Sequence, residues 1–328
     1  MKKNFAIVAM EEAAKELGMV FEVDARFHHV ARMVLPDGRV KYIRDAYIDI
    51  NGSGAAEVAR DKDYAAYFLK KSGFPVPRGE AFFTPEWAKT IGSTRTPERA
   101  WRYAQRIGLP VFVKPNSKMQ GRGVSRVANK VDFFMAVHRA SANERTFLVQ
   151  QPVHGKEFRV VVVNGEVVIA YQKTHPHIIG DGKLSVYDVI KKTYKSFLSP
   201  DGAGVRDGRI EEMLREQHLT LESVLESGRR VQLLPTANVS TGGSARDVTH
   251  LVHPQWCQIA VGIAQAMNLR YIGIDLIAEK DLSQKPSDYT VLEVNSAPGL
   301  EYFALLGPKQ MTIVKNVYKE ILSTLQQM

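Results

Sequence analysis

The chain has 328 residues, of which 45% are hydrophobic and 24% are charged, a balance that is typical of globular proteins and excludes disordered and fibrous classes. Lys and Arg number 44 against 35 Asp and Glu, and the formal charge of +9 favours anionic partners such as nucleotides and carboxylates. The cations are spread along the chain without a nucleic-acid-binding motif, and no stretch approaches the ~20 apolar residues of a membrane span. We therefore expect a cytoplasmic enzyme with more than one lobe that binds neither nucleic acid nor membrane.

The sole cysteine, Cys257, lies in an apolar-periodic segment, so no internal disulfide can form. A small buried side chain explains this residue better than a catalytic nucleophile does. The basic N-terminus precedes an apolar run that Glu11 and Glu12 interrupt, which argues against a cleavable leader.

Residues 1–94 predict a small N-terminal module and a linker helix. Two apolar runs within residues 30–43 flank Pro36-Asp37-Gly38 and predict a β-hairpin. Apolar positions at helical spacing predict one helix from Ala55 to Lys71.

Residues 95–152 predict a second module. Thr96-Pro97 suits a helix start, and residues 110–115 predict a short buried strand that contains Lys114 near its end. A glycine-containing loop at 117–124, a helix at 131–140 and a strand at 146–150 are expected to follow.

Residues 153–328 predict a third, larger module. The strands expected at 158–164 and 166–173 flank an Asn-Gly turn, which is a strong hairpin signal. A helical insertion is expected at about 184–235. Apolar residues at helical spacing predict core helices at 256–267 and 314–325.

Two strand-like runs near the C-terminus carry one Asp, one Glu and one Asn among apolar residues. Glu293 and Asn295 are two positions apart, so they point to the same face of a strand, and Asp275 can join them from a neighbouring strand. Three hard oxygen ligands suit Mg²⁺, which takes its remaining ligands from water and substrate phosphates, and Mn²⁺ is expected to substitute for it. The trio predicts an enzyme that acts on nucleotide phosphates.

The loop after Lys114 contains Gly121 and Gly123, which let backbone amides approach phosphate oxygens. This signal is weak alone, because the loop lacks both the P-loop spacing and the third glycine of a dinucleotide fingerprint. When the loop is considered in isolation, a surface hairpin is the better explanation.

The order of these features is more specific than any one of them. A strand-terminal lysine, a glycine loop, a strand ending at Gln150-Gln151, and finally the oxygen trio follow one another along the chain. This order resembles that of the ATP-grasp ligases, and it is most similar to the ATP-grasp domains of cyanophycin synthetase and bifunctional glutathione synthetases. Three further stretches carry the resemblance: residues 51–62, which include Asp61-Lys62, residues 178–186 and residues 236–249.

The resemblance implies an α/β (α+β) ATP-grasp fold in which two lobes sandwich ATP, preceded by the N-terminal module. It assigns one set of residues to ATP, from the small lobe, its glycine lid and the hinge: Lys114, Lys118, Gly121, Gly123, Gln150, Gln151, Val153 and Glu157. It assigns Arg159, Lys173 and Asn238 to catalysis, and we add Arg246 to this set by hypothesis, because relatives have a neutral residue at that position. Asp275, Glu293 and Asn295 become its Mg²⁺ ligands.

The sequence departs from the family pattern at several positions. Gln150 stands where glutamate is common, Lys173 where arginine is common, and Leu234 where relatives have an arginine. Lysine and arginine are not equivalent at an anion site. We hypothesise that Arg246 replaces the cation lost at Leu234.

The implied reaction is ATP-dependent amide-bond formation between a carboxylate and an amine through an acyl phosphate, with release of ADP and phosphate. The substrates are expected to be amino acids or short peptides, and a homo-oligomer is implied. Two alternatives stay open: a ligase acting on a polypeptide tail, and a non-catalytic ATP-binding regulatory protein. His175 and His177 invite a metal assignment, but they lack the further ligands that a zinc site needs.

Overall fold

The computed structural model describes residues 4–118, 121–194 and 208–328, which pack as two compact units. Among these residues, no helix is long and apolar enough to cross a membrane. Unit 1 comprises Met1–Val76, His154–Gln172 and Ala245–Met328, and unit 2 comprises Pro77–Val153 and Lys173–Ser244.

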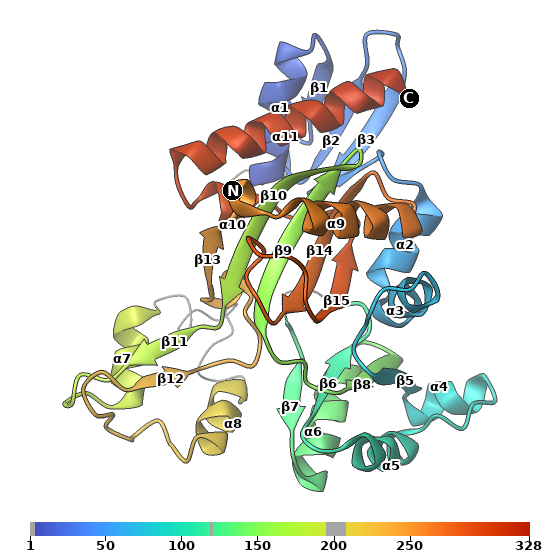
Figure 1. Cartoon of the computed structure of the whole chain (residues 1–328). Helices are drawn as coiled ribbons and strands as arrows, with labels where there is room; N and C mark the ends of the chain where they lie inside the picture. The colour runs from blue at the N-terminus through green and yellow to red at the C-terminus, as the bar shows by residue number, and fades with distance from the viewer. Residues whose placement is uncertain (1–3, 119–120, 195–207) are drawn as a thin grey trace. The chain divides into compact units, whose positions relative to one another are not determined.

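The first and last helices of the chain pack against each other in unit 1 (Figure 1). Helix α1 (Phe5–Glu16) buries a face rich in alanine against α11 (Pro308–Gln327), and small side chains of this kind let two helices approach closely. Two ion pairs flank the contact, Lys315 with Glu12 and Lys319 with Glu16, each at 2.7 Å.

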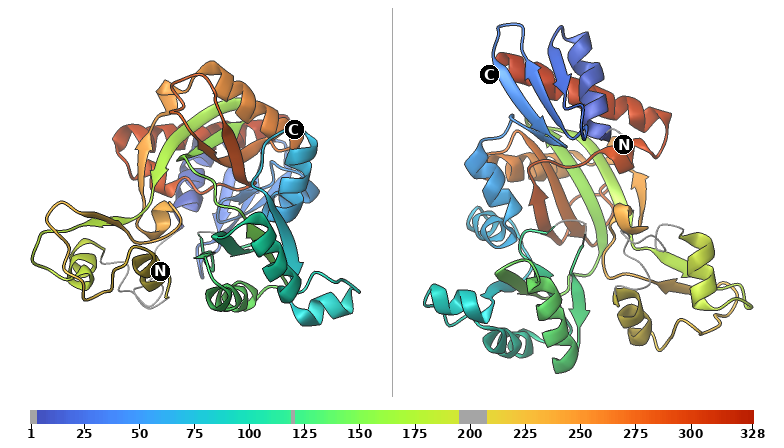
Figure 2. Two further views of the ribbon diagram at one scale, coloured as in Figure 1. Left: turned by 60° about the horizontal axis from the view of Figure 1, so that its bottom comes forward. Right: turned by 180° about the vertical axis from the view of Figure 1, so that it is seen from behind.

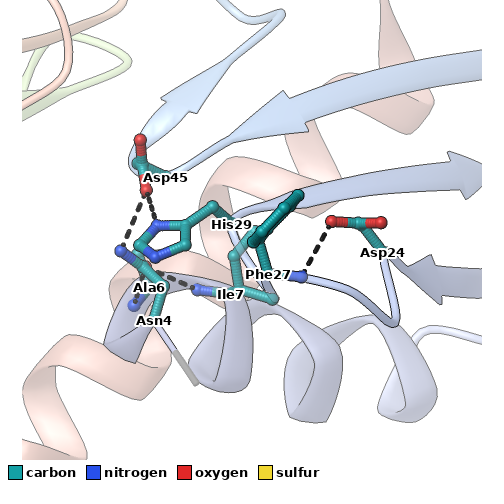
Figure 3. Close-up of polar contacts among 7 residues, drawn as sticks. All are labelled: Asn4, Ala6, Ile7, Asp24, Phe27, His29 and Asp45. Carbon is teal, nitrogen blue, oxygen red and sulfur yellow. Dashed lines mark hydrogen bonds and ion pairs between the residues drawn. The ribbon is translucent and has the colours of Figure 1, made fainter. Parts of the chain in front are cut away.

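A four-stranded antiparallel sheet follows α1, in the order β1 (Val20–Val23), β2 (Val30–Val34), β3 (Val40–Arg44) and β4 (Tyr47–Ile48). The hairpin expected at residues 30–43 is confirmed. Asp45, in the β3–β4 turn, contacts His29 Nδ1 at 2.6 Å and accepts a hydrogen bond from Asn4 Nδ2 at 3.1 Å, while Asn4 Oδ1 caps the first turn of α1 (Figure 3). These contacts fix the start of α1 on the sheet.

The segment expected to form one helix from Ala55 to Lys71 forms two, α2 (Ser53–Arg60) and α3 (Lys62–Lys71). The break is at Asp61, whose backbone is extended and whose carboxylate accepts a hydrogen bond from Tyr64 N at 2.9 Å. The expectation of a single helix was wrong because this aspartate caps a new helix in the middle of a continuous apolar pattern.

The main sheet of unit 1 has the strand order β13-β10-β9-β14-β15 (Figures 1 and 2). Asn164 and Gly165 have positive φ at the turn between β9 and β10, as the Asn-Gly signal predicted. Helix α9 (Pro254–Ala266) covers one face with an apolar core that includes Trp256, Ile263 and Ile274. The elements of this region are β9 (Lys156–Val163), β10 (Glu166–Thr174), β13 (Ser244–Asp247), β14 (Tyr271–Ala278), β15 (Tyr289–Asn295), α10 (Glu301–Ala304) and the short 3-10 helix η3 (Thr249–Leu251).

Unit 2 contains a four-stranded antiparallel sheet of its own, with the strand order β5-β8-β6-β7. Its core is aromatic and β-branched, with Phe133 and Phe147 fully buried, and α5 and α6 contribute to it. The elements are β5 (Gly79–Phe83), α4 (Pro85–Thr90), α5 (Pro97–Ile107), β6 (Val111–Pro115), β7 (Ser125–Val127), α6 (Lys130–Ser141) and β8 (Thr146–Gln150).

The expected insertion is a small subdomain with its own core rather than a purely helical segment. Strand β11 (His177–Ile179) pairs with β12 (Arg230–Gln232), so the subdomain begins before residue 184. Within its described residues, the helices are α7 (Val186–Thr193), α8 (Arg209–Glu216) and the 3-10 helix η2 (Val239–Thr241).

The structure divides the chain differently from the boundaries expected at residues 94/95 and 152/153. Strand β5 pairs with β8 along its whole length, so unit 2 begins at Pro77. The insertion belongs to unit 2, together with the last residues of β10 and the first residue of β13. Strand pairing between distant segments decides both boundaries, and the sequence shows only local composition changes.

Candidate active site

A buried ion pair in unit 1 joins Arg159 on β9 to Asp275 on β14. The two residues are directly opposite in the antiparallel register, so their side chains leave the sheet on the same face. The guanidinium contacts both carboxylate oxygens: Nε donates to Oδ1, and Nη2 donates to Oδ2 at 2.6 Å. Burial by itself lowers the pKa of Arg159, but the negative charges of Asp275 and Glu293 raise it by more, so the pKa lies above its ordinary value.

Glu293 and Asn295 on β15 extend this pair into a cluster. Asp275 is opposite Glu293, and Gly273 is opposite Asn295, so the three predicted ligands lie on one face of adjacent strands. Glu293 Oε2 is 3.5 Å from Lys62 Nζ, at the first position of α3. We name the set Arg159, Asp275, Glu293, Asn295 and Lys62 the carboxylate cluster.

Gly273 leaves space for this cluster. A Cβ atom at Gly273 would be 2.7 Å from Pro298 Cβ and 3.3 Å from Arg159 Nη1. Any larger residue would therefore displace Pro298 or the guanidinium. The absent side chain lets Arg159 lie flat across β14 and reach Asp275.

Asn51 fixes the ends of the two strands that carry the cluster. Its Nδ2 donates to Tyr271 O at 2.7 Å and to Ser296 O at 2.9 Å, and its Oδ1 accepts from Arg270 N at 2.8 Å and from Tyr271 N at 3.1 Å. The Asn51 side-chain amide thus forms hydrogen bonds to backbone groups next to β14 and β15 through its nitrogen and its oxygen. This anchor holds Ser296, and with it the adjacent Asn295.

The carboxylate cluster fits a hard divalent cation. Among the described residues, no three or more His, Cys, Asp or Glu side chains gather as a metal site, so the fit depends on the amide of Asn295. Asn295 Nδ2 is buried and has no hydrogen-bond partner among those residues. Because amide orientation is assigned rather than observed, rotating this amide places Oδ1 in the same position, where a cation would satisfy it. Two carboxylates and one amide oxygen form a donor set that suits Mg²⁺.

In unit 2, Lys114 and Gln150 share one face of the sheet. Gln150 is opposite Phe112 in the β6–β8 register, and Lys114 is two residues beyond Phe112, so all three side chains leave the sheet on the side away from the Val113 and Val149 core. Gln150 is 6% exposed. A Cβ at Gly79 would lie 2.3 Å from Gln150 Cγ, so only glycine lets β5 pass this close to the glutamine.

The glycine loop, of which residues 119 and 120 are outside the described residues, reaches the segment that precedes η2. Gly121 and Gly123 have φ of +67° and +74°, values that favour glycine. A Cβ at Gly121 would lie 2.6 Å from Asn238 Nδ2 and 2.8 Å from Thr236 Oγ1. Arg209 Nη1 donates to Gly121 O at 2.7 Å. The structure therefore brings together Gly121 and Asn238, two predicted site residues separated by more than one hundred positions.

The remaining predicted site residues lie on, or next to, strands and loops already described, each within its own unit. Lys118 belongs to the glycine loop, and Gln151 and Val153 to the segment that follows β8. The Gln151 backbone N–H donates to Arg78 O at 2.9 Å. Glu157 is on β9 two residues before Arg159, on the same face. Lys173 lies near the end of β10 and is 5% exposed.

Arg246 does not join the carboxylate cluster. Its Nη2 donates to Gln172 Oε1 at 2.9 Å and is 3.8 Å from Asp281 Oδ1, and Asp281 also pairs with Lys156. Lys156 is three residues before Arg159 on β9, so the two side chains leave opposite faces of the strand.

Leu234 is fully buried in the apolar core of the insertion, with Ile178, Ile210 and Leu233 among its neighbours. The expectation that Arg246 replaces a charge lost at Leu234 stays a prediction, since Leu234 belongs to unit 2 and Arg246 to unit 1. The residue at 234 completes a core, and Arg246 is paired on the opposite face of the main sheet from Arg159.

Sequence reasoning gave no role to Lys62, Asn51 or Arg209. Lys62 and Asn51 lie within residues 51–62, a stretch that carried the family resemblance. That resemblance was the sequence signal that could have identified them. The contacts of Lys62 and Asn51 with β14 and β15 join residues more than 200 positions apart, so only the fold could reveal them.

Two family models match the chain. One, described as D-ala D-ala ligase C-terminus, matches residues 68–201, and another, described as RimK-like ATP-grasp domain, matches residues 235–325. The chain belongs to the ATP-grasp superfamily. This membership confirms the resemblance inferred from the order of the motifs, and with it the α/β ATP-grasp fold.

Among curated relatives, cyanophycin synthetase of Crocosphaera subtropica is 31% identical to this ATP-grasp chain over 271 residues, which are 79% of the chain and 30% of that protein. The glutathione biosynthesis bifunctional protein GshAB of Mannheimia succiniciproducens is 32% identical over 243 residues, which are 70% of the chain and 31% of that protein. The chain thus spans less than a third of the length of these two relatives.

Solved structures show the same fold. The bifunctional glutathione synthetase of Pasteurella multocida superposes with a TM-score of 0.55 at 22% identity, over 97% of this chain and 44% of that one. A D-alanine–D-alanine ligase of Bacillus anthracis gives a TM-score of 0.51 at 14% identity, over 83% of this chain and 68% of that one.

Proposed function

We propose that this ATP-grasp chain is an ATP-dependent carboxylate–amine ligase that forms an amide bond between amino acids or short peptides. The observation that supports this most directly is the carboxylate cluster, in which three oxygen ligands and a buried arginine share one face of adjacent strands. The relatives named cyanophycin synthetase and glutathione biosynthesis protein fit such a chemistry.

The proposed reaction has two steps. A carboxylate oxygen of the first substrate attacks the γ-phosphorus of ATP, the bond from that phosphorus to the bridging oxygen breaks, and ADP leaves. The nitrogen of the second substrate then attacks the acyl carbon, the carbon–oxygen bond to phosphate breaks, and phosphate leaves as the amine loses a proton. Phosphoryl transfer of this kind depends on alignment and charge stabilisation more than on covalent help from side chains.

Arg159 is proposed to stabilise the charge that gathers on the transferred phosphoryl group. Asp275 holds Nε and Nη2 and so fixes the plane of the guanidinium, while Nη1 takes no part in that pair. A cation held in this way loses little freedom when an anion binds, which is the basis of electrostatic preorganisation.

Lys114 and Gln150 are proposed to bind the phosphates and the base of ATP, with Lys118, Gln151, Val153 and Glu157 as further contacts. The glycines at 121 and 123 are proposed to present backbone amides to phosphate oxygens. Asn238, which lies against Gly121, and the buried Lys173 are proposed to contact the substrates.

Mg²⁺ is proposed to be held by Asp275, Glu293 and Asn295. When bound, it would act as a Lewis acid and withdraw charge from the reacting phosphoryl group.

An ADP-release assay over amino acids, taken singly and in pairs, tests the proposal. A pair that releases ADP where neither member does so alone would identify both substrates, and product masses would separate small-molecule ligation from extension of a polypeptide. Glu293→Ala should abolish ADP release without loss of the circular dichroism spectrum, whereas Lys156→Met, on the same sheet, should leave turnover unchanged. Near-normal activity of Glu293→Ala at saturating Mg²⁺ would refute the metal assignment, and ATP binding without ADP release for any substrate would favour a regulatory role.

A further inference from the structure

Lys62 faces a residue that is proposed to bind metal. Its Nζ lies 3.5 Å from Glu293 Oε2, and its side chain is 12% exposed. Lys62 is the first residue of α3, and the hydrogen bond from Tyr64 N to Asp61 fixes the backbone at this point. The ammonium group is therefore held close to Glu293 by the start of the helix.

The carboxylate cluster is balanced in charge without a metal. Arg159 and Lys62 offset Asp275 and Glu293, one cation for each carboxylate. A divalent cation that binds to this set is repelled by the positive charges of Arg159 and Lys62. Binding therefore requires either that one of these side chains moves away or that the repulsion lowers the affinity.

The two cations differ in how firmly they are held by their carboxylates. The two cations are similarly exposed, Arg159 at 14% and Lys62 at 12%, but Arg159 contacts both oxygens of Asp275 in a fork. Lys62 approaches only one oxygen of Glu293, at a longer distance, and Glu293 is 29% exposed. The lysine ammonium also ends a flexible four-carbon chain, whereas the guanidinium is a rigid planar fork. Lys62 is therefore the cation that can exchange.

We propose that Lys62 is the resident counter-ion of Glu293 in the metal-free protein, and that a divalent cation binds by displacing its ammonium group. The proposal rests on the metal site of the proposed function, and it adds that Lys62 competes with the metal ion for Glu293. Lys62 lowers the affinity of the free protein for metal, and it prevents Glu293 from remaining a bare carboxylate beside Asp275 when no metal is bound.

Metal binding to the full chain without nucleotide tests this role. Mn²⁺ is titrated against wild type, Lys62→Met and Lys62→Gln, and free Mn²⁺ is measured by electron paramagnetic resonance. Removal of the competing ammonium should tighten Mn²⁺ binding by about three- to tenfold, the range expected for loss of one partly buried ion pair. The control Lys156→Met, which breaks an ion pair with Asp281 on the same strand system, should bind Mn²⁺ as wild type does.

A double variant makes the test specific. A Glu293→Gln background removes the ion pair between Lys62 and Glu293, so Lys62→Met should tighten Mn²⁺ binding much less there than it does in wild type. Equal or weaker Mn²⁺ affinity in both Lys62 variants, with circular dichroism unchanged, would overturn the role of Lys62 alone. Absence of Mn²⁺ binding in wild type and in every variant, both without nucleotide and with a non-hydrolysable ATP analogue, would instead refute the metal site of the proposed function.

Discussion

The ion pair between Arg159 and Asp275 offers a stability test that needs no substrate. Asp275→Asn keeps the shape of the side chain but leaves the guanidinium without its counter-charge. The Arg159 and Asp275 side chains are 14% and 4% exposed, so water cannot replace the lost partner. Breaking one side of a buried pair costs about 3 to 5 kcal/mol, and we expect a loss of that size in the free energy of unfolding.

An exposed pair on the same strand provides the matched control. The Lys156 and Asp281 side chains are 43% and 35% exposed, and their contact of 2.7 Å is short. Solvent screens such pairs, so Lys156→Met should cost only about 0 to 1 kcal/mol. The contrast between the two variants measures burial rather than the mere presence of an ion pair.

The measurement is urea unfolding with EDTA present, which removes any contribution from bound metal. Trp256 is the one tryptophan of unit 1, so its fluorescence in a Trp87→Phe, Trp101→Phe background follows that unit alone. The double variant Arg159→Met, Asp275→Leu should recover most of the loss, because two apolar groups leave no buried charge. A cost below about 1 kcal/mol for Asp275→Asn would refute the reasoning.

Three further predictions concern single residues. Gly121→Ala combines strain at positive φ with a Cβ placed 2.6 Å from Asn238 Nδ2, and should raise KM for ATP at least several-fold, whereas Gly92→Ala, with φ of +66° and no atom within 4 Å, should not. Asn51→Ala leaves backbone groups beside β14 and β15 without their partner and should lower the free energy of unfolding by about 2 to 3 kcal/mol, and a change indistinguishable from zero in urea titrations would contradict the anchoring role. Burial raises the pKa of Asp247, but side-chain hydrogen bonds lower it by more, so its contribution to stability is present above its unfolded pKa of about 3.9 and is lost as pH falls through the lower folded value. Asp247→Asn should therefore reduce the slope of unfolding free energy against pH in the acid range. An unchanged slope would contradict the stabilising role of the ionised Asp247 side chain.

Local patterns predicted most of the elements. The Asn164-Gly165 turn, the core helix near Trp256 and the strands that carry Asp275 and Glu293 all follow from periodicity and turn residues, because these depend on the geometry of a few neighbouring positions. The break at Asp61 escaped detection because a capping aspartate interrupts the helix without interrupting its apolar spacing.

The candidate site was predictable in part. The two-residue spacing of Glu293 and Asn295 placed them on one face of a strand, and the order of motifs gave the family. The ion pair between Arg159 and Asp275 was not foreseen, because it depends on the register between two strands more than one hundred residues apart. For the same reason, no local sequence pattern could predict which face of the main sheet Arg246 occupies.

By itself, the sequence determined the fold family and located the glycine loop, and it predicted the three oxygen ligands Asp275, Glu293 and Asn295, since each depends on residue types at short spacing. Only the tertiary structure decided which cations meet those ligands. Lys62 and Arg159 reach Glu293 and Asp275 through strand pairing and helix placement, and these arise from burial of apolar surface over the whole unit. The charge balance of the site is therefore a property of the fold, although the sequence specifies each charged residue in it.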